Sequence, residues 1–506
     1  MGGVSEIIQH VQLPLEIKVA PYLMDHQFKG KAVLPAVEAM QVLAASTKAW
    51  RPELNVCALA DARFSRFLYL HPDMPSIPAM NDMALYGDGR VVSTLLTRTR
   101  SKRAGITRTH AHVRLEFPCD PKDPTLPPAD ELFALEGIGL NIRSDEIYRS
   151  LVPFGPSFQN IAGELTLTYQ GAVATVRAPD HGAAGYPLGS LFPLDAAFHA
   201  ACVYGQRYLG IVGFPVGFTY RHLFRLTVPG NTYLTRIILR KSAPDRPVFD
   251  IWITDRGGTL HEAVLGVTMQ DVSGGETKPP KWIRADRTAE NDVPFSDGAV
   301  SCVMELSSVK GAGVKALSRG EHERFEKLGE RRQKSFLAAR LCLKRLSRVL
   351  SDGDAMTPAS FIHTMASDAI RPRCPLTDGA DSGFCSVSHD KRFVIAVASG
   401  SRVGVDVEQS TERLVYARRI YMNDEEKALT ERSPLGMRGA SLRIWSIKEA
   451  MAKAFGMTLA ESWDRVAVKE IGETQCRVFL EENEYVAIHH QVADHMFTLV
   501  DTGCGT

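Results

Sequence analysis

Two long segments of almost unbroken apolar character most constrain how this chain can fold. Residues 35–50 read PAVEAMQVLAASTKAW, and residues 193–210 read PLDAAFHAACVYGQRYLG. Pro35 suits the first position of a helix, because that position needs no backbone N–H donor. A helix that is apolar on nearly every side must be covered by other elements. Each segment therefore predicts a helix that the surrounding chain wraps.

Strand-like stretches around both helices supply that cover. They are rich in β-branched and aromatic residues, which favour pleated strands. They span residues 91–100, 106–117, 164–178, 232–243, 247–255 and 262–272. Several antiparallel strands can bury one helix economically. We therefore expect two helix-in-sheet units side by side.

Two polar segments rich in proline mark the expected domain boundaries. Residues 117–131 read FPCDPKDPTLPPADE, and residues 271–298 also combine Pro, Gly and charged residues, as linkers do. The expected organisation is a first unit over 1–120, a second over 132–272, a linker over 273–297 and a third domain over 298–506.

The third domain shows a different pattern of elements. An arginine-rich helix is expected over about 320–350, then strands over 387–399 and 403–408, and a helix that begins near residue 444. Helices and strands that mix in this way predict an α+β domain. With its two helix-in-sheet units, the chain as a whole is predicted to be of the α+β class.

Charge and cysteine content exclude several function classes. The chain has 59 basic and 58 acidic residues, for a formal net charge of +1. This balance predicts no general attraction to nucleic acid or to an anionic membrane. No apolar run approaches the roughly 18 residues that a membrane helix needs. The nine cysteines are scattered without a CxxC pair, so we expect a reduced, cytoplasmic protein.

A carboxyl group and an imidazole lie on the second apolar helix. Asp195 and His199 are four residues apart and share one helix face. A buried carboxyl group must be paired or stay protonated, and a protonated carboxyl group can act as a general acid. His26, just before the first apolar helix, is a candidate base. Structural interpretations remain open, because a histidine in this position often packs and a buried Asp–His pair can be a simple hydrogen bond.

Three motifs in this region resemble the dehydratase domains of polyketide synthases. HQFKGKAVLP fits HxxxGxxxxP with His26, VPFGPSFQ resembles YGPxF with Phe154 at the tyrosine position, and LDAAFH fits DxxxQ/H with Asp195 and His199. The resemblance covers residues 1–272 and implies a double hotdog fold. It implies that His26 takes the α-proton of a 3-hydroxyacyl chain on a carrier protein and that Asp195 protonates the leaving hydroxyl group, while His199 orients Asp195.

The thioester oxygen gains negative charge in such a reaction, and backbone N–H groups at a helix start suit that charge. Gly189 and Ser190 precede the second apolar helix and are the candidates for this role. Pro193 lies two residues before Asp195, where the family usually has its proline four residues before. Dehydratases of that family often form dimers, so the resemblance also admits a homodimer through this half.

A second group of acidic residues lies in the third domain. In VGVDVE, Asp406 and Glu408 alternate with apolar residues and therefore point to one face of a strand. Glu449 and Lys453 share one face of the following helix. Carboxylates side by side favour a hard cation such as Mg²⁺, and a nearby ammonium suits phosphoryl oxygens. Taken singly, each pattern also fits an ordinary solvated surface.

The combination resembles the 4′-phosphopantetheinyl transferases of the Sfp type. VGVDVE and WSIKEAMAK match that family's motifs, SVSHDKRF matches its Ser-His element and IRPRCP its basic-proline element. The resemblance covers residues 298–506. It implies transfer of phosphopantetheine from coenzyme A to a carrier serine, with Mg²⁺ held by Asp406, Glu408 and Glu449. Glu449 would act as the base, and Lys453 would offset charge on the pyrophosphate.

The same resemblance implies a set of residues that bind coenzyme A. They are Arg371, Ser388, His389 and Lys448, with Lys334 and Arg340 on the arginine-rich helix.

Together the two halves predict a bifunctional enzyme that serves acyl carrier proteins in polyketide or unusual fatty-acid synthesis. The pair resembles the C-terminal end of iterative synthases of the enediyne and polyunsaturated kind. No carrier-type serine motif occurs in the chain, so the carrier is expected in trans or upstream in a longer synthase. Two alternatives stay open for the N-terminal half: a product-template-like cyclase or isomerase, and a non-catalytic module that docks the carrier.

Overall fold

The computed structural model describes residues 6–100, 107–180, 186–284, 295, 299–350, 357–365, 372 and 384–503. The chain forms two compact units. Unit 1 contains Met1–Leu126 and Leu140–Arg287, and unit 2 contains Pro127–Gly139 and Thr288–Thr506. The second helix-in-sheet region thus begins at residue 140, eight residues after the expected start at 132. Much of the expected linker, residues 285–294 and 296–297, lies outside the described residues.

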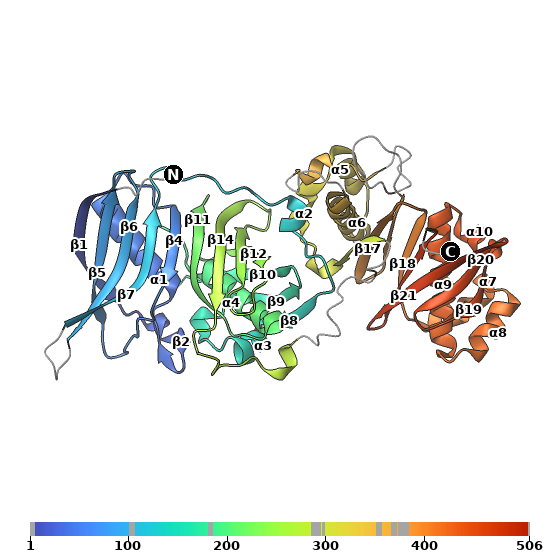
Figure 1. The fold of residues 1–506 in the computed structure, drawn as a ribbon, viewed down its shortest axis with the longest axis horizontal. Helices are drawn as coiled ribbons and strands as arrows, with labels where there is room; N and C mark the ends of the chain where they lie inside the picture. Colours follow the sequence, from blue (N-terminus) through green and yellow to red (C-terminus); the bar gives the residue numbers. More distant parts are fainter. Residues whose placement is uncertain are drawn as a thin grey trace. The chain divides into compact units, whose positions relative to one another are not determined.

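Unit 1 is built on one antiparallel sheet of twelve strands (Figure 1). Its first half contains β1 (Ile7–Lys18), β4 (Ala58–Phe64), β5 (Ser76–Tyr86), β6 (Val91–Arg100) and β7 (Thr107–Phe117). Its second half contains β8 (Leu140–Arg143), β9 (Ile161–Thr168), β10 (Gly171–Arg177), β11 (Phe214–Leu223), β12 (Thr232–Lys241), β13 (Val248–Thr254) and β14 (Leu260–Gln270). The order across the sheet is β1-β5-β6-β7-β4-β11-β14-β13-β12-β10-β9-β8.

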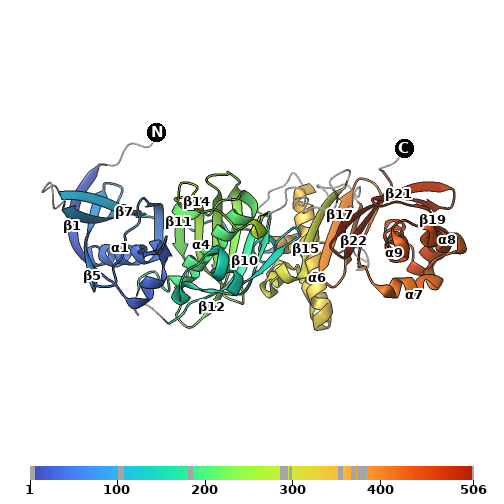
Figure 2. The same cartoon turned by 90° about the horizontal axis from the view of Figure 1, so that it is seen from below.

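Each half of the sheet packs on one helix, as Figure 2 shows. Helix α1 (Ala36–Trp50) packs on β1, β5, β6 and β7, and helix α4 (Phe192–Tyr204) packs on β9 to β13. Every residue of α4 is buried, as its apolar sequence predicts. Strand β4 pairs with β11, with Ala60 opposite Tyr220, and joins the halves. Two sheet-wrapped helices in one continuous sheet form a double hotdog, which confirms the expected fold.

Unit 2 contains two sheets. The first has the order β15-β17-β16 and the second the order β18-β22-β21-β20-β19. Their strands are β15 (Val300–Glu305), β16 (Phe384–His389), β17 (Phe393–Ser399), β18 (Val403–Gln409), β19 (Val466–Ile471), β20 (Gln475–Leu480), β21 (Asn483–Val492) and β22 (His495–Asp501). The helices are α5 (Arg319–Glu326), α6 (Glu330–Leu350), α7 (Glu412–Tyr421), α8 (Asp424–Arg432), α9 (Gly436–Phe455) and α10 (Leu459–Arg465). This is the expected α+β arrangement.

The two longest described helices of unit 2 pack on its two sheets. Helix α6 packs on β15 and β17, and α9 packs on β18 and β22. The approach of α9 to β18 depends on Gly404, because a Cβ atom there would lie 1.9 Å from the carbonyl oxygen of Ala450. This contact brings the acidic residues of β18 close to those of α9.

Residues 127–139, here called the connector arm, pack in unit 2 although they join two strands of unit 1. The arm contains the short helix α2 (Ala129–Leu132), which lies near α6 in Figure 1. The backbone N–H of Gly137 donates to the carbonyl of Val303 at 2.8 Å, and the N–H of Lys310 donates to the carbonyl of Phe133 at 2.9 Å. The arm thus forms main-chain hydrogen bonds with β15 and with the segment that follows β15.

Buried charges fix the connector arm more firmly. Asp130 is buried and forms an ion pair with Arg348 of α6. Arg345 donates to the carbonyl oxygens of Asp130 and Ala134, each at 2.6 Å. Arg345 is itself buried, so these oxygens replace the water that its guanidinium group loses. The arm is therefore part of the core of unit 2.

Among the described residues, no helix has both the length and the apolar character that a bilayer crossing requires.

Candidate active sites

The imidazole of His26 is held in one tautomer. His26 lies between the 3-10 helix η1 (Pro21–Asp25) and the short strand β2 (Gln27–Phe28). Its Nδ1 lies 3.1 Å from the carbonyl oxygen of Val33. A carbonyl oxygen only accepts hydrogen bonds, so Nδ1 carries the proton and Nε2 keeps a free lone pair. Burial lowers the pKa of His26, while Asp195 opposes the shift. The ring is therefore a neutral base at neutral pH.

A loop of the second hotdog covers this ring. Phe154 stacks on His26 with ring centroids 4.5 Å apart, and its centroid lies 4.9 Å from that of His199. Asp25 anchors the loop, because the N–H of Ser157 donates to its Oδ2 at 2.9 Å and the N–H of Gly155 to its carbonyl oxygen at 2.8 Å. The motif FGP thus holds an aromatic ring between two imidazoles.

Asp195 and His199 lie on α4 and face this ring. Each is 4% exposed, and Nε2 of His199 lies 3.1 Å from Oδ2 of Asp195. Phe154 packs against both His26 and His199, and His199 contacts Asp195, so all three side chains line one site. The sequence prediction of a base and an acid from distant segments therefore has the required proximity. It missed Tyr148, whose hydroxyl lies 3.4 Å from Nδ1 of His199 and which no motif marks.

The expected donors for a thioester oxygen are not available. The N–H of Gly189 donates to the carbonyl of Tyr186 at 3.2 Å, and the N–H of Ser190 donates to the carbonyl of Thr227 at 2.9 Å. Both N–H groups form backbone hydrogen bonds that fix the loop before α4, so they are not free to donate to a thioester oxygen. The expectation that Gly189 and Ser190 form an oxyanion hole is therefore wrong for this conformation of the loop.

A second site forms where β18 meets α9 in unit 2. Asp406 is buried, and its carboxylate accepts hydrogen bonds from Ser388 at 2.9 Å, Ser446 at 2.8 Å and Lys453 at 3.0 Å. Lys453 also lies 3.8 Å from the carboxylate of Glu449. The serine of the predicted Ser-His element and the lysine of the predicted helix motif thus meet at one aspartate.

Burial and the negative charge of Asp406 raise the pKa of both Glu408 and Glu449. Burial first, and Asp406 second, raise the pKa of each glutamate to about 7. Carboxyl groups that repel one another in this way favour a cation between them. In the described parts of the chain, no three acidic, histidine or cysteine side chains lie where they could hold a metal ion together, so the expected three-carboxylate set of Asp406, Glu408 and Glu449 is not formed. Mg²⁺ needs no such set, because it keeps several waters and uses one or two carboxylates. The residues therefore fit Mg²⁺.

The other residues predicted to bind coenzyme A differ in whether they lie next to the acidic site. His389 is exposed next to Ser388, and partial burial and the ammonium of Lys453 lower its pKa. Lys334 is exposed on α6. Arg371 lies outside the described residues. Ser388 and His389 thus adjoin the acidic site, and Lys334 is available to solvent.

Two predicted ligand residues are instead structural. Lys448 is 0% exposed and pairs with Glu426 at 2.8 Å, and it also donates to the carbonyl oxygen of Tyr421. Arg340 is buried, and it donates to the carbonyl oxygen of Thr364 at 2.7 Å. Because both cations already use buried protein acceptors, the prediction that they bind coenzyme A does not agree with their placement.

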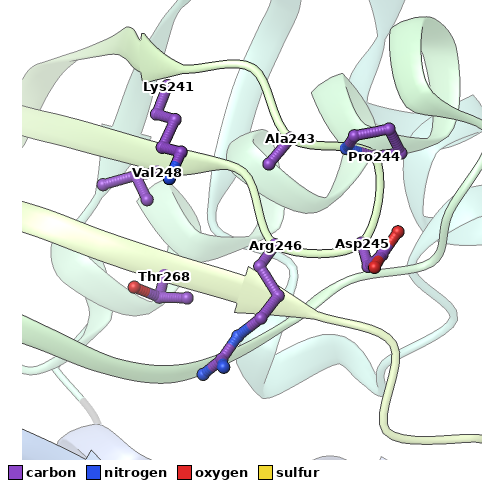
Figure 3. A pocket seen from close by; sticks show the side chains of 7 residues that line it. All are labelled: Lys241, Ala243, Pro244, Asp245, Arg246, Val248 and Thr268. Carbon is purple, nitrogen blue, oxygen red and sulfur yellow. The ribbon is translucent and has the colours of Figure 1, made fainter.

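The most evident surface hollow is unrelated to either group of residues. It has a volume of about 420 Å³ and lies at the turn between β12 and β13 (Figure 3). Its lining residues are Lys241, Ala243, Pro244, Asp245, Arg246, Val248 and Thr268. None of the predicted site residues is among them, and the hollow is open to solvent.

Comparison with known proteins identifies part of unit 2. Residues 402–500 match the family model of the 4′-phosphopantetheinyl transferase superfamily. The matched region contains β18, α9 and the acidic residues described above, so the expected resemblance to phosphopantetheinyl transferases is confirmed over this part of the chain. A search of curated proteins found no match.

Several solved structures resemble about half of the chain. A dehydratase domain of a trans-AT polyketide synthase from Brevibacillus brevis is 16% identical, with a TM-score of 0.42 over 52% of this chain and 94% of that chain. The dehydratase domain of PpsC from Mycobacterium tuberculosis is 21% identical, with a TM-score of 0.39 over 53% and 97%. That of RzxB from Pseudomonas fluorescens is 13% identical, with a TM-score of 0.41 over 51% and 94%. The double-hotdog assignment rests on the strand order and helix packing described above.

Proposed function

We propose that the chain is a bifunctional, cytoplasmic enzyme that acts on acyl carrier proteins. Unit 1 dehydrates 3-hydroxyacyl-carrier protein to 2-enoyl-carrier protein, and unit 2 transfers 4′-phosphopantetheine from coenzyme A to a carrier serine. Both reactions belong to polyketide or unusual fatty-acid synthesis. The observation that carries the first activity is the free Nε2 of His26 in one buried site with Asp195. The match at residues 402–500 carries the second.

Dehydration uses the two groups as base and acid. Nε2 of His26 takes the α-proton, and the electron pair of that C–H bond forms the new double bond. The bond between the β-carbon and oxygen breaks, and the hydroxyl group leaves as water with the proton of Asp195. The products are the enoyl thioester, water, an imidazolium ion and a carboxylate. Asp195 is buried and His26 is half-buried under Phe154, which limits the access of water and strengthens the electrostatic effects of the site.

The dehydratase test uses a 3-hydroxyacyl-carrier protein and follows the mass of the product. Loss of one water is expected, and His26→Ala should lower the rate roughly 100-fold or more. His10→Ala is the matched control, because His10 is about half exposed on β1 and should leave the rate unchanged. A product of unchanged mass but altered structure would favour the cyclase or isomerase alternative. No conversion by the intact chain would favour a docking module.

Phosphopantetheine transfer uses the acidic site of unit 2. One or two of the carboxylates of Asp406, Glu408 and Glu449 would hold Mg²⁺, which would supply positive charge for the pyrophosphate of coenzyme A. Glu449 takes the proton of the carrier serine. The serine oxygen attacks the β-phosphorus, and the bond to adenosine 3′,5′-bisphosphate breaks. Lys453 offsets the charge that builds on the leaving phosphate.

The transferase test mixes the protein with an apo carrier, coenzyme A and Mg²⁺ and reads the mass of the carrier. A gain of one phosphopantetheine group is expected. Asp406→Asn should lower the rate roughly 100-fold, while Asp424→Asn should leave it unchanged, because Asp424 is 98% exposed on α8. An unchanged carrier mass for every apo carrier offered would count against this activity.

A further inference from the structure

We infer that Tyr148 is a positioning residue of unit 1: it fixes the tautomer of His199 so that His199 presents an N–H donor to Asp195. The inference rests on the proposed dehydration, in which Asp195 changes from acid to carboxylate. Tyr148 belongs to η2 (Ile147–Leu151), a π-helical turn before the loop that carries Phe154. It belongs to none of the sequence motifs.

The oxygen of the Tyr148 hydroxyl group accepts a hydrogen bond from the backbone. The N–H of Ile161 donates to its oxygen at 2.8 Å. The hydroxyl proton is therefore free for an acceptor, and Nδ1 of His199 lies 3.4 Å away. The two rings meet edge to face, with centroids 5.8 Å apart. Burial raises the pKa of Tyr148, so the hydroxyl group keeps its proton throughout the range in which enzymes work.

A hydrogen bond from Tyr148 to Nδ1 of His199 determines whether Nε2, on the other side of the imidazole ring, carries a proton. If Nδ1 of His199 accepts from Tyr148, the proton of a neutral ring must lie on Nε2. Nε2 is the atom that lies 3.1 Å from Oδ2 of Asp195, a distance at which a small rotation of either side chain would align a hydrogen bond that the two atoms do not form in this conformation. The ionisable groups that face the pair are His26 on the segment before β2, Asp195 on α4 and Tyr148 on η2. Of these, only Tyr148 can donate to Nδ1.

The orientation matters most when Asp195 loses its proton. An Nε2–H group can then donate to the new carboxylate, which stabilises the charge that develops in the transition state. In the other tautomer, the lone pair of Nε2 would face the carboxylate and repel it. A histidine needs a partner that selects its tautomer, whereas a glutamine amide always offers N–H donors. Loss of the Tyr148 hydroxyl group should therefore lower the dehydration rate only when residue 199 is a histidine.

A double-mutant cycle tests this dependence in the full chain. Tyr148→Phe should lower kcat for dehydration roughly tenfold or more with little change in KM. The rate of His199→Gln serves as the reference, and Tyr148→Phe combined with His199→Gln should match that rate within about twofold. Tyr148→Phe removes the acceptor of the Ile161 N–H both in the wild type and in His199→Gln. If Tyr148 had a purely structural role, Tyr148→Phe would therefore lower the dehydration rate by the same factor in both proteins. Equal penalties would overturn the inference.

A second measurement does not depend on activity. In the unliganded protein, ¹⁵N chemical shifts of His199, assigned by comparison with His199→Gln, should show an unprotonated Nδ1 and a protonated Nε2. Tyr148→Phe should shift this pattern toward the other tautomer. A protonated Nδ1 in the wild type would overturn the inference. If the intact chain does not dehydrate its substrate but shows the expected shifts, the proposed function fails and the tautomer assignment stands.

Discussion

The two ring nitrogens of His26 have different tasks. Nδ1 donates to Val33 and sets the ring plane, while Nε2 stays free. Phe154 stacks on the ring and excludes water from one of its faces. Burial is the largest influence on the pKa of His26, and it lowers that pKa from the ordinary value of 6.5. The base form of the ring therefore persists in mildly acidic solution.

This shift predicts the acid limb of the pH profile for dehydration. Because the pKa of His26 is lowered, the ring is still neutral at pH 6.5, its ordinary value. We expect kcat/KM to stay near its maximum down to that pH and to fall only below it, as the free enzyme takes up a proton. Initial rates in buffers of constant ionic strength measure the profile. A half-maximal value above pH 6.5 would contradict the expectation.

The structure brings predicted residues together where the chemistry of a motif requires several side chains to meet. His26, Asp195 and His199 share a site, and Asp406 contacts both Ser388 and Lys453. The sequence was a poor guide where positive charge alone suggested that a residue binds coenzyme A.

Lys448 and Arg340 look like phosphate-binding cations in the sequence, yet both use buried protein acceptors. Helical spacing shows which face a residue shares with its neighbours. It does not show whether that face lies in a core that already holds a partner such as Glu426.

At the scale of elements, the apolar helices were predictable because their composition leaves them no solvated face. The expected helix over 35–50 is α1, and the expected helix over 193–210 is α4 followed by a π-helical turn. The single arginine-rich helix expected over 320–350 is instead α5 and α6, which are separate helices. Gly329 lies at this break, where its carbonyl oxygen accepts hydrogen bonds from the N–H groups of Arg332 and Gln333 in the first turn of α6. Such a local break leaves only a weak signal in composition.

The contact between β18 and α9 predicts the effect of a small substitution. Gly404→Ala would place a methyl group 1.9 Å from the carbonyl oxygen of Ala450, so the helix must move away from the strand. We expect a loss of about 1–3 kcal/mol in the stability of unit 2. Transferase activity should fall as well, because Asp406 and Glu449 lie on the two separated elements. Chemical denaturation and carrier mass measure the two effects.

Gly400→Ala is the matched control for this substitution. A Cβ atom at Gly400 would meet nothing within 4 Å, and the residue precedes β18 on the same stretch of chain. Its stability and activity should equal those of the wild type. Equal effects of Gly404→Ala and Gly400→Ala would show that the close approach of α9 does not limit this part of the fold.

At the scale of the whole molecule, the chain passes between the two units three times, since unit 2 contains both Pro127–Gly139 and Thr288–Thr506. The sequence suggested a simple linker at 117–131, because proline and aspartate are abundant there. It could not show that the connector arm contributes Asp130 to the buried charges of α6. Long-range packing of this kind leaves no periodic signal.

The connector arm predicts a selective effect of substitution in the full chain. Asp130→Ala would leave the guanidinium group of Arg348 without its buried carboxylate, and breaking a buried pair costs about 3–5 kcal/mol. We expect lower thermal stability and lower transferase activity, while the dehydratase activity stays near that of the wild type. Thr125→Ala, at an exposed position just before the arm, should change neither activity. Equal loss of both activities with Asp130→Ala would contradict this division.

The connector arm also determines how the enzyme would respond to a protease. A single cut in the segment around residues 285–298 would produce two bands on a denaturing gel, but the upstream fragment would still carry the arm inside unit 2. The nicked protein should therefore migrate as one particle on a sizing column. Release of unit 2 would require two more cuts, one on each side of the arm, and the short peptide between them would stay with it. For the same reason, exchanging one unit for that of another protein requires three junctions in the gene.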